Sequence, residues 1–208
     1  MADAFAIADP RASDADRAAD RKTLAEMYVK SHGSETGLGD AILAAYDRTK
    51  LLLDARKSHL QAIDPNFGVA DPMRFVLTGL DGKKLGLGSL KGKVMILDFW
   101  ATWCVPCRSQ HPLYEVVKQK FKDRDDVVFL AIDADEDRPL VEPFLDEQKW
   151  SHAVYFEDGL QRLLKVEQIP TTIMFDKQGR LWSRMNGFIP ERFVDTLTDR
   201  IKEALAEN

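Results

Sequence analysis

KVMILDFWATWCVPCRSQ, residues 93–110, joins an almost wholly apolar run to a pair of cysteines. Val94–Trp100 has the length and composition of a strand that is buried on both faces. A helix is predicted to follow, with Pro106 in its first turn, where the missing N–H costs little. The sequence therefore predicts that Cys104 stands between the end of a buried strand and the start of a helix.

Cys104 and Cys107 are the only cysteines of the chain, and their spacing is CxxC. At a helix start, unpaired backbone N–H groups and the helix dipole favour a thiolate, so we expect the pKa of Cys104 to lie below the free value of about 8.5. Cys107, one turn on, can attack a mixed disulfide at Cys104 and release the partner. Pro106 limits the freedom of the loop, and Trp100 and Trp103 are expected to place apolar surface around the sulfurs.

Other uses of a CxxC pair fit this chain less well. A structural zinc site needs four ligands, and there is no third cysteine. The four histidines include no HxxxH pair; they are His32, His59, His111 and His152. A c-type haem needs His directly after the second cysteine, where this chain has Arg108. A peroxidase of the peroxiredoxin kind and two inert buried cysteines remain as alternatives to dithiol exchange.

The sequence beyond the motif alternates between strand and helix patterns. Strands are predicted on both sides of the motif, at 75–78, 127–132, 153–156, 171–175 and 181–185. Helices are predicted at about 139–145, 158–165 and 190–206. Such alternation indicates an α/β fold with a central sheet flanked by helices, and the sheet is mixed because the last two strands form a hairpin.

Two further expectations concern the helix after the motif and an acidic stretch. The helix is expected to bury the stripe Leu113, Val116, Val117, Lys120 and Phe121. A calcium loop at Asp133, Asp135, Glu136 and Asp137 lacks the required Gly and terminal Glu spacing, so a solvated acidic loop is expected there.

The N-terminal third has a different organisation from the rest. Residues 1–16 are predicted to be a loose tail or the frayed start of a helix, and 17–31 and 40–63 to be helices joined by a polar loop. A linker is expected near Pro72. We therefore predict two parts: a helical N-terminal extension at 1–70, which could be the remnant of a longer helical region, and an α/β domain at 71–208.

Composition and charge restrict the partners of the chain. Apolar residues make up 45% and charged residues 30% of the 208, which suits a globular core. A net charge of −5 makes nucleic acid a poor partner. No run of 18 apolar residues is present, so no membrane span is expected, and the first residues lack the pattern of a secretion signal.

Four pieces occur together in an order that resembles the thioredoxin superfamily, in particular its TlpA/ResA branch. The active-site strand and helix of that branch resemble residues 93–110, and its N-terminal hairpin resembles FVLTGLDGKKLGLGSLKGK at 75–93. Residues 133–166 resemble its usual insertion, and VEQIPTTIMFDKQGR at 166–180 resembles the segment with the cis-proline. The resemblance covers the chain from about Phe75 to its end, and implies a thioredoxin-like fold there.

For the chemistry, the resemblance implies roles for three residues. Cys104 matches the exposed nucleophile, Cys107 the resolving thiol, and Asp98 the buried acid that takes or gives a proton to the resolving thiol. The TlpA/ResA branch often has Asn in place of Asp98, and some members have Glu in place of Gln110. The lysine beside the acid of thioredoxin is replaced by an apolar residue near Phe129, which predicts that Asp98 has no such partner.

For substrate binding, the resemblance implies a groove beside the two cysteines. Pro170 matches the cis-proline that faces the disulfide, and Ile169 before it would leave its backbone free to pair with an extended substrate. Gly187 matches the small residue at the border of that groove. Trp103 and Pro106 are expected to contribute from the side of the motif.

These features together predict a thiol–disulfide oxidoreductase that reduces protein disulfides through Cys-Val-Pro-Cys. No cofactor or metal is expected, because the dithiol is itself the redox group. The expected partners are protein disulfide or dithiol substrates and an upstream reductant, and the chain is expected to be a monomer. The alternatives are a thiol peroxidase and a partner-binding module on a thioredoxin scaffold. The resemblance suggests an extracytoplasmic location, with the cytoplasm as the alternative.

Overall fold

The computed structural model describes residues 13–207, which form two compact units that meet in sequence between Asp64 and Pro65. Residues 1–12, which fall in the predicted tail, lie outside the described residues. Among the described residues, no helix is both long enough and apolar enough to cross a membrane.

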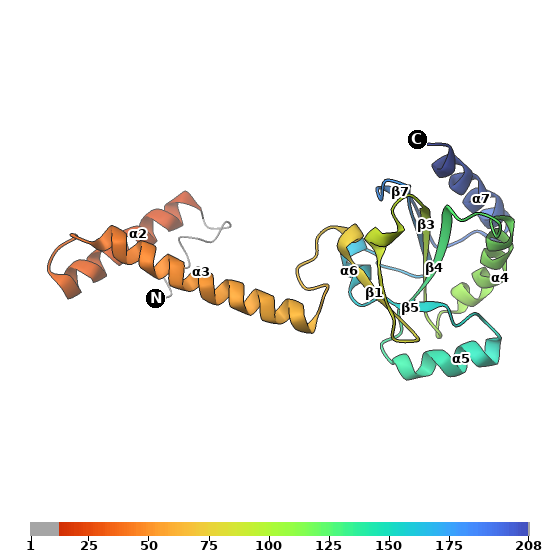
Figure 1. The fold of residues 1–208 in the computed structure, drawn as a ribbon, viewed down its shortest axis with the longest axis horizontal. Helices are drawn as coiled ribbons and strands as arrows, with labels where there is room; N and C mark the ends of the chain where they lie inside the picture. The colour runs from red at the N-terminus through yellow and green to blue at the C-terminus, as the bar shows by residue number, and fades with distance from the viewer. Residues whose placement is uncertain (1–12, 208) are drawn as a thin grey trace. The chain divides into compact units, whose positions relative to one another are not determined.

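The first unit consists of helices α2 (Asp14–His32) and α3 (Leu38–Ile63) (Figure 1). Ser13 begins α2 with a capping box, in which its hydroxyl accepts from the N–H of Asp16 and the Asp16 carboxylate accepts from the N–H of Ser13. Gly33 ends α2 in the left-handed conformation, at φ 79°. None of the described residues of either helix is buried. Large apolar side chains are exposed on both: Met27, Leu43, Tyr46, Leu51, Leu52, Leu53 and Ile63.

The second unit is built on one seven-stranded mixed sheet. Its order is β2 (Lys84–Gly86), β1 (Val76–Gly79), β5 (Val154–Phe156), β4 (Val127–Asp133), β3 (Val94–Trp100), β6 (Thr171–Phe175) and β7 (Leu181–Asn186). Strands β3, β4 and β5 are parallel, and the remaining neighbours are antiparallel. This arrangement confirms the predicted α/β class with a mixed central sheet.

Helices connect the strands and cover the sheet. They are α4 (Val105–Lys120), α5 (Val141–Gln148), α6 (Leu160–Leu164) and α7 (Pro190–Ala206). Three short 3-10 turns lie at Pro72–Arg74, Leu87–Leu90 and Arg138–Leu140. Figure 1 shows α4 and α7 side by side, and they pack against each other.

Strand β3 has side chains buried on both faces, as its apolar composition predicts. Val94 and Ile96 belong to the core that α4 and α7 complete, whereas Met95 and Leu97 belong to the opposite core with α6. Because side chains alternate along a strand, Asp98 shares the α4 face with Ile96. The only acid of β3 is therefore directed at the helix that carries the cysteines.

The buried face of α4 differs from the predicted stripe. Val117 is buried, but Val116 is 47% exposed, and the buried positions also include Gln110 and Tyr114. The prediction was wrong for Val116 and for Lys120, which is also exposed, because the helix is rotated relative to the predicted stripe. The helix instead turns two polar side chains inward, toward the face of β3 that contains Asp98.

Candidate active site

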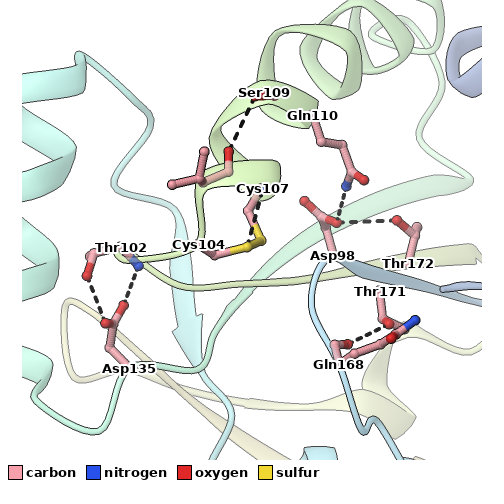
Figure 2. The surroundings of a disulfide bond; sticks show 11 residues. Asp98, Thr102, Cys104, Cys107, Ser109, Gln110, Asp135, Gln168, Thr171 and Thr172 are labelled. Carbon is pink, nitrogen blue, oxygen red and sulfur yellow. Dashed lines mark hydrogen bonds between the residues drawn. A yellow bond between two sulfur atoms is a disulfide. The ribbon is translucent and has the colours of Figure 1, made fainter. Parts of the chain in front are cut away.

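Cys104 and Cys107 form a disulfide at the start of α4, with their Cα atoms 5.2 Å apart. Cys104 is the N-cap of the helix, and its sulfur accepts a hydrogen bond from the N–H of Cys107 at 3.2 Å (Figure 2). The β3–α4 connection thus places Cys104 where helix N–H groups can stabilise a thiolate once the disulfide is reduced. Pro106 lies in the first turn, as predicted.

The cysteines are less exposed than the resemblance implies. Cys104 is only 2% exposed, because it packs in an apolar cluster with Trp100, Ala101 and the partly buried Ile169. The expectation of an exposed nucleophile is therefore wrong for this disulfide form. Trp100 does supply apolar surface beside the sulfurs, but Trp103 is 66% exposed and lies outside that cluster.

Trp103 borders a different feature, an open hollow on the surface. The hollow has a volume of about 390 Å³ and is also lined by Thr102, Arg108 and Phe144. Trp103 therefore presents its ring to solvent from the segment that precedes the disulfide, rather than covering the sulfurs.

Asp98 is buried and hydrogen-bonded by two neutral side chains. Its Oδ1 accepts from Nε2 of Gln110 at 2.8 Å and from Oγ1 of Thr172 at 3.3 Å (Figure 2). Burial raises the pKa of Asp98 to about 7, although these two hydrogen bonds and the charge of Lys118 oppose the rise. A carboxyl with this pKa can both accept and release a proton near neutral pH.

Lys118 supplies a positive charge near Asp98 from a different element than the lysine of thioredoxin. The position near Phe129 is indeed apolar, but Lys118 of α4 lines the same cavity as Asp98, and its positive charge lowers the pKa of Asp98. Sequence reasoning missed Lys118 because it looked for the lysine on the neighbouring strand. Helical spacing could have found it, since Lys118 follows Cys107 by 11 positions, or about three turns.

The Ile169–Pro170 peptide bond is cis and directly precedes β6. Ile169 packs against the cluster that contains both cysteines. The N–H of Gly187 donates to the carbonyl of Pro170 at 2.7 Å, and Gly187 has φ 68°. Thr171 is tied back to the carbonyl of Gln168 by its hydroxyl at 2.7 Å (Figure 2). The structure thus brings Ile169, Pro170 and Gly187 together.

The predicted solvated acidic loop is confirmed at Glu136 and Asp137, which are exposed, but the prediction was wrong for Asp133. Asp133 is the last residue of β4 and only 1% exposed, because β3 and β5 flank it in the sheet. Burial and the nearby carboxyl of Asp135 raise the pKa of Asp133 to about 8. Asp135 accepts from the N–H of Thr102 at 2.7 Å and from its hydroxyl at 2.8 Å (Figure 2). Asp135 therefore anchors the turn that leads into Cys104.

Comparison with known proteins gives consistent matches over the second unit. A family profile described as Thioredoxin-like matches residues 92–181. The chain is 35% identical over 115 residues to a thiol-disulfide oxidoreductase ResA of Bacillus cereus, a match that covers 54% of this chain and 66% of that protein, just under two thirds. It is 34% identical over 131 residues to ResA of Bacillus thuringiensis subsp. konkukian, covering 62% of this chain and 73% of the relative.

Solved structures match the same region. A thiol:disulfide interchange protein DsbE from Chlorobium tepidum aligns with a TM-score of 0.57 and 30% identity, covering 64% of this chain and 93% of that one. A protein disulfide isomerase from Bacteroides thetaiotaomicron aligns with the same TM-score and identity, covering 64% and 86%. With the CxxC disulfide at the helix start and the mixed sheet, these matches place the chain in the family of thioredoxin-like thiol–disulfide oxidoreductases.

Proposed function

We propose that this chain reduces disulfide bonds of other proteins by dithiol exchange, with residues 71–208 as the catalytic domain and residues 1–70 as a helical extension. The observation that carries the proposal is the Cys104–Cys107 disulfide at the N-terminus of α4, with the buried Asp98 on the adjoining strand. The single CxxC pair can shuttle between dithiol and disulfide, and this requires no bound cofactor.

The exchange begins with the reduced protein. The Cys104 thiolate attacks one sulfur of a substrate disulfide, and the other substrate sulfur leaves as a thiolate. Cys107 then gives its proton to the Asp98 carboxylate, and its sulfur attacks Cys104. The bond to the substrate breaks, and the second substrate sulfur leaves with the electron pair. The protein ends as the disulfide seen in the structure, and a dithiol reductant must restore the reduced form.

We assign the substrate groove to the surface around the cis-proline loop. The backbone of Ile169 would pair with an extended substrate segment, with Pro170 and Gly187 shaping its border and Pro106 and the exposed Trp103 adding contacts from the motif side. The apolar packing of Cys104 means that a substrate must approach closely before its sulfur can be attacked. This favours protein substrates that place a disulfide in an extended segment.

Covalent trapping of a substrate, run beside an insulin-reduction assay, tests this function. Cys107→Ser should accumulate a mixed disulfide between Cys104 and an insulin chain, visible as a mass increase that dithiothreitol removes, because no resolving thiol is present. Cys104→Ser is the matched control and should trap nothing. A Cys107→Ser protein that forms no adduct would contradict the proposal.

The direction of transfer is tested by the reduction potential of the pair. Equilibration against dithiothreitol, followed by trapping of free thiols, should give a two-electron transition near the thioredoxin value of about −270 mV. A value near about −120 mV would instead indicate a protein that introduces disulfides.

A further inference from the structure

A small cavity of about 60 Å³ connects the buried acid to one face of α4. Asp98 lines it from β3, and Cys107, His111, Tyr114, Glu115 and Lys118 line it from α4. The five α4 residues follow one another at steps of four, three, one and three positions, which places all of them on one side of the helix. The cavity is thus part of the same helix face that holds the resolving cysteine.

Charged and aromatic side chains surround the outer part of this cavity. Nζ of Lys118 lies 2.7 Å from Oε1 of Glu115, and Nε2 of His111 lies 4.0 Å from the same oxygen. The imidazole of His111 stacks on the ring of Trp150, with their centroids 3.6 Å apart. His111, Glu115 and Lys118 are each partly exposed, so solvent meets the cavity at this group.

The cavity is large enough and polar enough to hold water. A volume of about 60 Å³ exceeds the roughly 10–15 Å³ that one water needs. The hydroxyl of Tyr114 is buried and has no hydrogen-bond partner among the described residues, although it lines the cavity. Together with the Asp98 carboxyl, it offers the polar contacts that fix a buried water.

We propose that this cavity is the route by which Asp98 exchanges its proton with solvent, and that Lys118 is a positioning residue whose charge sets how readily the acid takes and releases that proton. The inference rests on the proposed dithiol exchange. When Cys107 forms its bond to Cys104, its thiol proton passes to the Asp98 carboxylate. The acid must then lose that proton before the next cycle, and the cavity leads from it to the ionisable groups at the surface.

The electrostatics of the cavity support this assignment. The described titratable side chains that line it with Asp98 in the oxidised protein all come from α4, and they are His111, Tyr114, Glu115 and Lys118. The hydrogen-bond partner of Asp98 from β6, Thr172, is uncharged, and so are the residues that line the cavity from β4 and the loop after α5: Phe129, Ala131, Trp150 and Ser151. Lys118 is thus the positive side chain that favours the carboxylate over the carboxylic acid. Burial lowers the pKa of His111, which favours the neutral form of its imidazole beside the Glu115–Lys118 pair.

The experiment replaces Lys118 and follows Asp98 directly. Carbon-13 NMR of labelled aspartate in the oxidised full-length chain measures the pKa of Asp98, and Asp98→Asn identifies its signal. Lys118→Met removes the charge and keeps the length of the side chain, Lys118→Arg keeps the charge, and Lys122→Met is a control at an exposed lysine outside the cavity.

We expect Lys118→Met to raise the pKa of Asp98, so that the midpoint of its titration moves up by about one pH unit. Lys118→Arg and Lys122→Met should leave the pKa near the wild-type value. At pH values below the new midpoint, a smaller fraction of Asp98 is ionised in Lys118→Met. The rate at which the reduced protein forms its own disulfide with excess insulin should fall there by up to about tenfold, and the pH profile of this rate should move upward by about one pH unit.

Two results would overturn the inference. One is an Asp98 titration in Lys118→Met that coincides with the wild type, and the other is an equal shift in Lys122→Met, which would indicate a general charge effect. Both leave trapping by Cys107→Ser intact, so they are separable from failure of the proposed function, in which no adduct forms at Cys104.

Discussion

Replacing Asp98 with asparagine should stabilise the protein in a strongly pH-dependent manner. The native pKa of Asp98 is about 7, against an ordinary value of 3.8 in the unfolded chain. Below about pH 4 both states hold the proton, and the acid has no effect on stability. As the pH rises from 4 to 7, the unfolded state releases its proton first, so the native state loses about 1.4 kcal/mol of stability per pH unit. Above pH 7 the accumulated loss is about 4 kcal/mol.

The amide that Asp98→Asn introduces can occupy this site with little rearrangement. Its oxygen can accept from Gln110 as the carboxylate does. Its NH₂ group has an acceptor within the same pair, because Oε1 of Gln110 is buried and has no hydrogen-bond partner among the described residues. The stability gained by Asp98→Asn should therefore increase by about 3 kcal/mol between pH 5 and pH 8.

Urea unfolding of the oxidised proteins, followed by tryptophan fluorescence, measures this difference. All four tryptophans lie in the second unit, at positions 100, 103, 150 and 182, so the signal reports on the unit that contains Asp98. The contribution of Asp133 is present in both proteins and cancels in the difference. Asp123→Asn, at an exposed acid, is the control and should stay parallel to the wild type. Parallel curves for Asp98→Asn would refute the reasoning, because they would mean that Asp98 is already ionised in the native protein at pH 5.

Two further substitutions test features that the structure corrected. Val117→Ala should lower the free energy of unfolding by about 2 kcal/mol because Val117 is fully buried. Val116→Ala, at an exposed position, should change it by less than about 0.5 kcal/mol. Equal effects of the two substitutions in urea unfolding would reject the observed rotation of α4. Asp135→Ala removes both acceptors of Thr102 and should lower the free energy of unfolding by about 1–3 kcal/mol. Asp137→Ala, at an exposed acid, is the control and should change it little. An unchanged free energy of unfolding in Asp135→Ala would show that the Asp135–Thr102 contact does not stabilise the protein.

The central strand and the motif were predictable because each has a strong local signal. Val94–Trp100 is apolar at every position but one, a pattern typical of a strand between two layers, and the structure buries all of it. Cys104 at the start of a helix follows from the proline two positions later. For these elements, local pattern and tertiary packing require the same arrangement.

The environment of the polar side chains was harder to predict. Gln110 counts as a surface residue by composition, yet it is buried because Asp98 on β3 needs a donor. Asp133 belongs to an acidic stretch, but its place at the end of a strand inside the sheet decides its burial. The approach of Lys118 to Asp98 depends on how α4 is rotated over the sheet. All three depend on contacts between distant residues, which periodicity along one segment does not contain.

The unburied helices α2 and α3 also bear on how the molecule opens under native conditions. A segment resists local unfolding in proportion to the buried contacts that it must give up, and none of the described residues of these two helices is buried. Their amide hydrogens should thus exchange with solvent at a much lower opening free energy than those of β3, which only global unfolding releases. Helices α2 and α3 and the sheet of the second unit would then behave as two separate cooperative units, and within residues 13–207 a protease would cleave first in α2 and α3.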